Sequence, residues 1–131
     1  WQGEPLAGKR LVHLHEVTGF PLLLPREEVS VRIALDNAAY RVGLRLQPAM
    51  ESDDFDLLRR LTAFDNGVAV LNRIDVLNAA REGRCVFVPL AEMRGFTQDL
   101  SVMHCAQARP TPAIRLVLDR LANLLATLSG P

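Results

Sequence analysis

Four short apolar runs are spaced along the first two-thirds of the chain. Each is rich in Val, Leu or Phe and is bounded by Pro, Gly or polar residues, which favours a strand over a helix. The runs are "FPLLLP", "LRLQPAM", "VAVLN" and "RCVFVPL". We expect Phe20–Leu24, Leu44–Met50, Val68–Leu71 and Cys85–Val88 to form one sheet, with Pro48 marking an edge or a bulge.

Segments with apolar residues at helical spacing separate these runs. They predict helices over Val31–Val42, over Asp54–Phe64 and within "IDVLNAAREG". We expect Ser52 or Asp53 to cap the second of them. Alternation of strands and helices is typical of a mostly parallel sheet with helices packed on its faces. The predicted fold class is therefore α/β.

The last part of the chain has a different pattern. "GFTQD" reads as a turn-like linker and "LSVMHCA" as a further strand. A long amphipathic helix follows, with Thr111 placed to cap it and Pro112 at its first position. Its apolar face comprises Ile114, Val117, Leu118, Leu121, Leu124, Leu125 and Leu128. Such a face must pack on something.

Composition excludes several classes of function. Fifteen basic and fifteen acidic side chains give a formal net charge of zero, so the chain has no overall electrostatic footprint for nucleic acid. No apolar run approaches the roughly 20 residues that cross a bilayer, and we expect no membrane partner. The sequence contains no G-x-S-x-G, no G-x-G-x-x-G and no phosphate-binding loop. We therefore expect no catalytic residue, no enzymatic activity and no cofactor.

Two pairs of residues leave alternatives open. His13 and His15 would share a face of a strand, which makes a metal site conceivable, but no further ligand has a supportive spacing, and we expect no metal. Cys85 and Cys105 lie in apolar runs and are expected to be buried reduced thiols of a cytoplasmic protein, with a redox pair as the alternative. His104 beside Cys105 does not predict a catalytic pair, because adjacent strand residues point to opposite faces.

Five stretches, in order along the chain, carry a resemblance to a known family. They are a "PLAG" lead, a strand that ends in Pro25, an R-x-x-L-D-x-A helix, a "GVAVL" strand and a "GRCVFVPL" strand. This series resembles the effector-binding domain of LysR-type bacterial transcriptional regulators over nearly the whole chain. Two positions depart from the family pattern. "DNG" replaces the usual Gly-rich turn before the third strand, and Asn72 replaces the Pro that often follows it.

The resemblance implies a bilobed fold like that of type 2 periplasmic binding proteins. A small-molecule cleft would lie between two α/β subdomains joined by crossing segments. Residues 1–18 would be the tail of the first subdomain and a crossover. Residues 19–98 would be the second subdomain, and residues 99–131 the strand and helix that return to the first. The DNA-binding winged helix-turn-helix of such regulators would be absent from this chain.

Four acidic residues gather where the second helix is expected to begin: Glu51, Asp53, Asp54 and Asp56. Ligands of open α/β sheets bind at the carboxyl ends of strands, so these acids either stabilise the helix dipole or face a ligand. They disfavour a bound phosphate or carboxylate at Asp53 and Asp54, unless Arg26, Arg32 and Arg73 lean into the cleft. The residues expected to bind the ligand are Pro25, Arg26, Ser30, Arg32, Ser52, Asp53, Phe55 and Asn72.

The expected function is that of a cytoplasmic effector-binding domain, which binds a small metabolite and thereby controls DNA binding and transcription. We expect a homo-oligomer, either a dimer or a tetramer, that reaches DNA only through a separate domain. The sequence leaves two alternatives open. One is a solute-binding α/β domain unrelated to DNA, and the other is a small enzyme of doubly wound fold.

Overall fold

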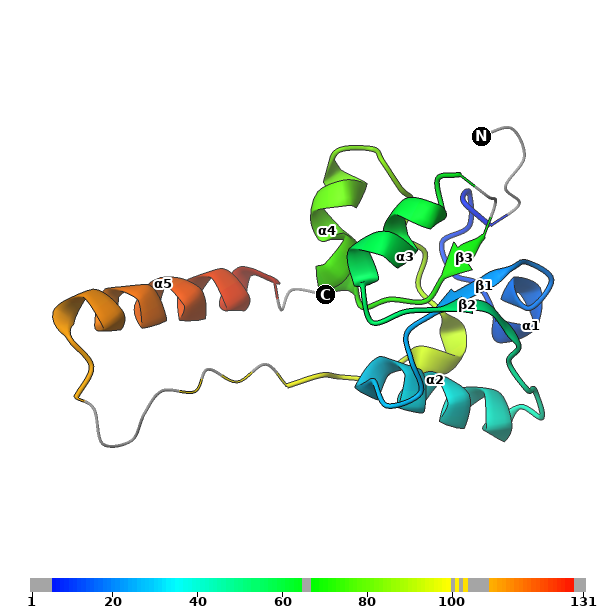
Figure 1. Cartoon of the computed structure of the whole chain (residues 1–131), viewed down its shortest axis with the longest axis horizontal. Coiled ribbons are helices and arrows are strands. Elements are labelled where there is room, and N and C mark those ends of the chain that lie inside the picture. The colour runs from blue at the N-terminus through cyan, green and yellow to red at the C-terminus, as the bar shows by residue number, and fades with distance from the viewer. Residues whose placement is uncertain (1–5, 65–66, 100, 102, 104–108, 129–131) are drawn as a thin grey trace. The chain divides into compact units, whose positions relative to one another are not determined.

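The chain forms two compact units, residues 1–96 and residues 97–131 (Figure 1). A computed structural model describes residues 6–64, 67–99, 101, 103 and 109–128. The larger unit holds the sheet and four α-helices, and the smaller one holds a single described helix.

Three parallel strands form the sheet of the larger unit. They are β1 (Leu22–Leu24), β2 (Pro48–Glu51) and β3 (Val68–Ala69), in the order β2-β1-β3. Every residue of the central strand β1 is buried. The strand predicted over Leu44–Met50 is shorter, because residues 44–47 have no regular secondary structure and Pro48 opens β2 instead of lying near its end. Pro48 pairs with Leu22 next to a shift in register, so the expectation of an edge or a bulge is confirmed. A parallel sheet flanked by helices confirms the predicted α/β class.

The prediction of a fourth strand over Cys85–Val88 is wrong. These residues have no regular secondary structure, and Leu90 makes only an isolated parallel bridge to Val12. The apolar pattern alone cannot create a strand, because a strand also needs a neighbour for its backbone hydrogen bonds. The predicted strand over residues 100–106, including His104 and Cys105, lies largely outside the described residues.

The three helices predicted between the strands are present. They are α2 (Ser30–Arg41), α3 (Phe55–Leu61) and α4 (Arg73–Arg81). Gly43 follows α2 with a φ of 72°, a backbone conformation that glycine adopts without strain and that ends the helix. Two short elements were not expected from the sequence: α1 (Leu14–Val17) and a 3-10 turn, η1 (Ala91–Met93).

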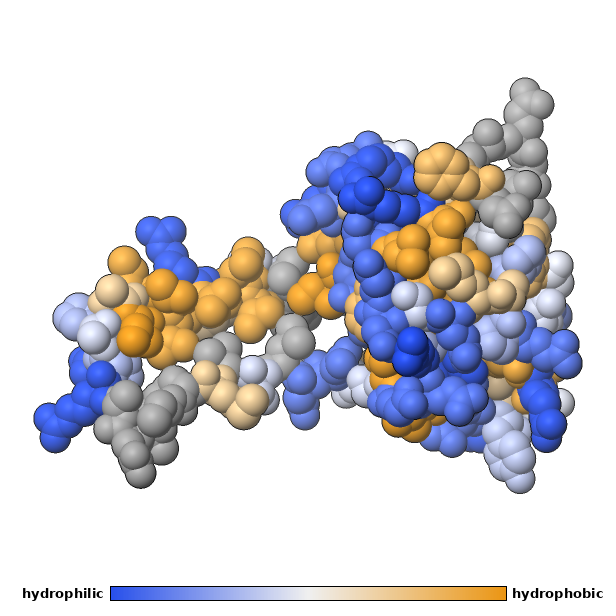
Figure 2. Space-filling model, in the orientation of Figure 1, coloured by the Kyte–Doolittle hydropathy of each residue, from blue (hydrophilic) through white to orange (hydrophobic). Residues whose placement is uncertain are grey.

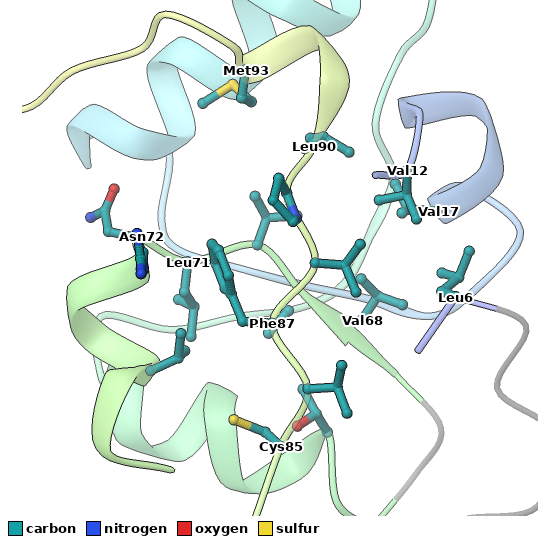
Figure 3. Close-up of a pocket in the computed structure, with 18 of the residues that line it drawn as sticks. Leu6, Val12, Val17, Val68, Leu71, Asn72, Cys85, Phe87, Leu90 and Met93 are labelled. Carbon is teal, nitrogen blue, oxygen red and sulfur yellow. The ribbon is translucent and has the colours of Figure 1, made fainter. Parts of the chain in front are cut away.

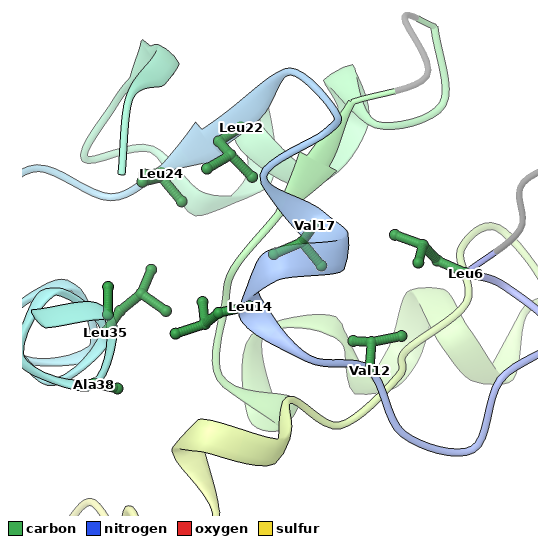
Figure 4. Close-up of a cluster of buried hydrophobic side chains, with 9 residues drawn as sticks. Leu6, Val12, Leu14, Val17, Leu22, Leu24, Leu35 and Ala38 are labelled. Carbon is green, nitrogen blue, oxygen red and sulfur yellow. The ribbon is translucent and has the colours of Figure 1, made fainter. Parts of the chain in front are cut away.

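Two apolar cores cover the two faces of the sheet. Leu22 and Leu24 point to one face and form the first core with Leu14 of α1 and Leu35 of α2 (Figure 4). Leu23, between them, points to the other face. There it packs in a second core with Leu58 of α3, Val76 of α4 and Leu71, which follows β3. Figure 1 shows the matching arrangement, with α1 and α2 on one side of the sheet and α3 and α4 on the other.

Hydrogen bonds connect residues 12–14, before β1, to residues 89–92 around η1. Glu92 accepts a hydrogen bond from the Leu14 backbone N–H at 3.0 Å and contacts His13 Nδ1 at 3.1 Å. Val12 donates its backbone N–H to the Pro89 carbonyl at 3.0 Å. Leu6, Val12 and Val17 are buried in the first core (Figure 4). Residues 6–17, expected to be a tail or crossover, thus belong to the same compact unit as the sheet.

The smaller unit contains α5 (Pro112–Leu128). Thr111 Oγ1 accepts a hydrogen bond from the Ile114 backbone N–H at 3.3 Å, which confirms the predicted cap. Apolar side chains stay exposed along this helix, including Val117 at 56% and Leu124 at 55% of their full area. Figure 2 shows these apolar side chains along its length.

Candidate functional site

The carboxyl ends of β1 and β2 are joined by one buried guanidinium. Arg32, on α2, is only 4% exposed. Its Nη1 donates to the Pro25 carbonyl at 2.9 Å, its Nε donates to Asp36 at 2.9 Å, and it also pairs with Glu51. Burial opposes the charge, but the hydrogen bonds with Glu51 and Asp36 outweigh it and raise the pKa of Arg32. The guanidinium is therefore held by groups of its own chain.

The neighbouring loops meet at a second, exposed ion pair. Arg26 Nε lies 3.4 Å from Asp53 Oδ2, and both side chains are more than 60% exposed. This pair joins the loop after β1 to the loop after β2. An exposed pair is weak and exchanges readily with water, so both groups remain open to a ligand.

The predicted cap of α3 was misplaced by one or two residues. Asp54 is the N-cap, and its carboxylate accepts the Leu57 backbone N–H at 3.0 Å. Ser52 accepts the Asp54 backbone N–H at 3.1 Å instead of capping the helix itself. Asp54 is the cap because an N-cap residue stands directly before the first helical residue, which here is Phe55. From that position the Asp54 carboxylate can reach the backbone N–H of the third residue after it, Leu57.

The remaining acid of this group is also paired. Asp56 Oδ2 lies 2.6 Å from Arg60 Nε, and its other oxygen binds Arg59. The hydrogen bond from Arg59 lowers the pKa of the Asp56 carboxyl. Among the four acids that gather here, each therefore has a cation or a backbone donor as partner.

The structure brings together five of the eight predicted ligand-binding residues. Pro25, Arg26, Arg32, Ser52 and Asp53 surround the carboxyl ends of β1 and β2. Ser30 is exposed at the first position of α2, and half-buried Phe55 begins α3 and packs against the second core. Asn72 lies after β3, which is on the opposite side of β1 from β2.

Asn72 is the N-cap of α4 and interacts with the first turn of that helix. Burial raises the pKa of the Asp75 carboxyl, and hydrogen bonds from the Asn72 side chain and backbone offset this only in part. Asp75 Oδ2 is buried and has no hydrogen-bond partner among the described residues. The Asn72 side chain thus lies near the buried Asp75 carboxyl and makes no side-chain cap hydrogen bond to α4.

A cavity of about 370 Å³ lies beside β3. Its longest walls are residues 67–73, which include β3, and residues 85–90 (Figure 3). We call this space the edge cavity. Among the residues predicted to bind a ligand, Asn72 is the one that lines it. Sequence reasoning missed the cavity, although the two apolar runs that form its walls were recognised as runs.

Metal and membrane sites find no support in the part of the chain that the structure describes. No group of three or more His, Cys, Asp or Glu residues there is arranged to hold a metal ion. His13 and His15 stack with their rings 5.6 Å apart, and His13 faces Glu92. No described helix is long and apolar enough to cross a bilayer. Cys85 is a half-buried free thiol, while Cys105 lies outside the described residues.

The sequence profile of the LysR substrate binding domain family matches residues 2–126. The chain belongs to this family. The LysR substrate binding domain has a fold like that of periplasmic binding proteins, and the three-stranded parallel sheet flanked by helices agrees with it. The family is regulatory and non-enzymatic, and its domains serve effector binding in LysR-type regulators. None of the curated proteins compared with the chain matches it.

Proposed function

We propose that this LysR substrate binding domain recognises a small metabolite at the rim formed by the carboxyl ends of β1 and β2, and so controls DNA binding and transcription. The match to the family over residues 2–126 carries the proposal. The rim supports it, because Arg26 and Asp53 present exposed, weakly paired charges where α/β sheets bind ligands. The eight residues predicted from the sequence remain our proposed ligand-binding set.

The chemistry of the rim favours a ligand with hydroxyl or amine groups. Glu51 is paired with Arg32 and Asp56 with Arg59 and Arg60, so these acids are already neutralised. Asp53 keeps an exposed carboxylate whose only described ion pair is the weak contact with Arg26. A hydroxyl or ammonium group can bind this carboxylate without removing a buried partner.

Control of transcription would follow from a shift in population. A ligand that binds one arrangement of two lobes more tightly than another favours that arrangement by its difference in binding free energy. In a homo-oligomer, this change passes to a separate DNA-binding domain as a coupling free energy. We propose this scheme for a cytoplasmic regulator that performs no catalysis itself.

A direct test compares a form of the protein that carries a DNA-binding domain with the 131-residue chain. Candidate metabolites are titrated into both by calorimetry, and DNA affinity of the longer form is measured with and without each metabolite. We expect binding by the longer form and a change in its DNA affinity. We expect weak binding by the 131-residue chain, because one lobe leaves much of a ligand in water.

Matched variants assign the binding to the rim. Asp53→Asn and Arg26→Gln should weaken metabolite binding, whereas Glu82→Gln should not, since Glu82 forms an exposed pair with Arg84 after α4. Metabolite binding without any change in DNA affinity would favour the solute-binding alternative. Equally tight binding by both forms would contradict a cleft shared between two lobes.

A further inference from the structure

The Arg26–Asp53 ion pair presents two opposite charges side by side at the rim. Arg26 Nε lies 3.4 Å from Asp53 Oδ2, and both side chains are largely exposed. A guanidinium carries several N–H donors and a carboxylate has two acceptor oxygens, so one such contact leaves donors and acceptors of both groups unused. A ligand that approaches this pair can therefore bind a positive and a negative group at once.

Arg26 is the arginine that can offer its charge to a ligand at the ends of β1 and β2. Arg32 is only 4% exposed, and its guanidinium is bound by groups of its own chain. Arg73 begins α4, which follows β3 on the opposite side of β1 from β2. An anionic group of the ligand is therefore expected at Arg26.

The two helices that begin at the rim differ in their N-termini. At α3, the Asp54 carboxylate already accepts the Leu57 backbone N–H at 3.0 Å. At α2, the N-cap is Val29, whose side chain makes no cap hydrogen bond. The Arg26 carbonyl accepts the Val29 backbone N–H at 3.0 Å, so Arg26 lies in the turn directly before α2. The dipole of α2 thus supports an anion near Arg26, whereas Asp54 opposes one near Asp53.

Acidic side chains outnumber basic ones around the pair. Residues 25–28 and 51–54, with two charged residues of α2, carry two basic and six acidic side chains, a formal charge of −4. These side chains are Arg26, Arg32, Glu27, Glu28, Asp36, Glu51, Asp53 and Asp54. The surplus of negative charge repels a ligand of net negative charge but not a zwitterion or a cation.

We propose that the ligand of the rim is an α-amino acid with a neutral or basic side chain, whose carboxylate binds Arg26 and whose ammonium group binds Asp53. In an α-amino acid a single carbon joins the two charged groups, which keeps the nitrogen and the nearer carboxylate oxygen about 3 Å apart. This spacing matches the 3.4 Å between Arg26 and Asp53, so four charges can alternate in sign without breaking the ion pair. The assignment rests on the proposed effector site and names the class of its ligand.

The first test titrates the standard amino acids into the form of the protein that carries a DNA-binding domain. Calorimetry measures binding, and DNA affinity is measured with each amino acid that binds. We expect at least one neutral or basic amino acid to bind and to change DNA affinity. Free aspartate and glutamate should bind at least about tenfold more weakly than the tightest binder, because their second carboxylate meets an acidic rim.

Two analogues of the tightest-binding amino acid separate the two contacts. Its carboxamide lacks the negative charge, and the acid without its α-amino group lacks the positive charge. The parent protein should bind each analogue at least about tenfold more weakly, since each loses a charge-assisted hydrogen bond. Arg26→Gln should bind the amino acid and its carboxamide equally, and Asp53→Asn should bind the amino acid and the deaminated acid equally. A purely structural role of either residue would weaken all three compounds by one factor.

Glu82→Gln is the control and should keep both preferences, because Glu82 pairs with Arg84 after α4. Circular dichroism should show that all three variants are folded. An Arg26→Gln protein that still prefers the amino acid to its carboxamide would overturn the inference. Response to a metabolite of another class, with no amino acid bound, would also overturn it but would leave the proposed function intact. Absence of a response to any metabolite would overturn both.

Discussion

Single residues around α3 have separable roles that their types alone do not reveal. Asp53 and Asp54 are adjacent and chemically identical. Asp54 caps α3, whereas Asp53 reaches across to Arg26 in the loop after β1. The difference arises from position, because the residue directly before the first helical residue is the one whose carboxylate can accept helix N–H groups.

This difference predicts unequal costs of substitution. Asp54→Ala should lower the free energy of unfolding by about 0.5–2 kcal/mol, the usual cost of an N-cap. Asp53→Ala should cost less than about 1 kcal/mol, as expected for an exposed ion pair. If Asp53 contacts the ligand, its substitution should nevertheless alter effector response well beyond that loss. Urea denaturation of the two variants measures the stabilities, and a larger loss for Asp53→Ala would contradict the assigned cap.

Asp75 should give the protein a distinct dependence of stability on pH. Burial raises the pKa of its carboxyl in the folded protein above the ordinary value of 3.8. Folding then favours the protonated form, so this residue's contribution to stability is fully present below pH 3.8 and is lost as pH rises through the raised pKa.

The variant Asp75→Asn isolates this contribution. The difference in free energy of unfolding between variant and parent should grow in favour of the variant as pH rises from about 4 toward neutrality. The lowered pKa values of Glu16, Asp56 and Glu92 make their contributions to stability increase with pH. Because variant and parent both contain these residues, their contributions cancel in the difference. Denaturation across this pH range measures the difference, and parallel curves would show that Asp75 ionises without penalty.

At the scale of elements, the side chain of Arg32 connects α2 with the ends of β1 and β2. Arg32 of α2 binds the carbonyl that follows β1 and the carboxylate that ends β2. The "R-x-x-L-D-x-A" stretch therefore holds a structural ion pair between Arg32 and Asp36 as well as the apolar face of α2. The same contacts shape the rim, since the loops that carry Arg26 and Asp53 leave from these two strand ends.

Removal of the Arg32 guanidinium should destabilise the lobe strongly. Arg32→Met keeps much of the side-chain volume but leaves the Glu51 and Asp36 carboxylates and the Pro25 carbonyl without their donor. Removing one partner of a buried charge pair typically lowers the free energy of unfolding by about 3–5 kcal/mol. Because the Asp36 and Glu51 carboxylates are partly exposed, we expect a loss for Arg32→Met at or below the lower end of this range. Thermal denaturation measures the loss, for which Arg45→Met, an exposed residue, is the control.

At the scale of the whole molecule, α5 predicts association. Ile114, Val117, Leu121 and Leu124 are each at least 39% exposed and recur at spacings of three and four residues. This leaves a continuous apolar stripe on α5, and such surfaces normally recruit another surface. We therefore expect a dimer or a larger assembly of the 131-residue chain.

Light scattering at tens of micromolar protein tests this expectation. Leu121→Glu should shift the population toward monomer, whereas Arg115→Glu, on the same helix but outside the stripe, should have a much smaller effect. The larger unit should keep its stability in both variants, as judged by its denaturation. A parent chain that is entirely monomeric under these conditions would contradict the prediction.

The sequence by itself determined the features that depend on neighbours along the chain. Apolar runs and helical stripes predicted the strands β1, β2 and β3, the helices α2 and α3 between them, α4 after β3 and the capped helix α5, because period and capping are local properties. The ordered motifs also indicated the family. The predicted rim residues near the ends of β1 and β2 lie close together because parallel strands end at one edge of the sheet.

Only the tertiary structure decided the features that depend on distant partners. Arg32 can be buried because Glu51 neutralises its charge and the Pro25 carbonyl accepts a hydrogen bond from it. The sequence around Arg32 does not indicate that these two groups are its partners. Cys85–Val88 has the apolar pattern of a strand and is not one, since no described residue supplies its backbone hydrogen bonds. Periodicity states which residues are apolar, whereas a strand, a buried charge and the edge cavity are each defined by what lies beside them in space.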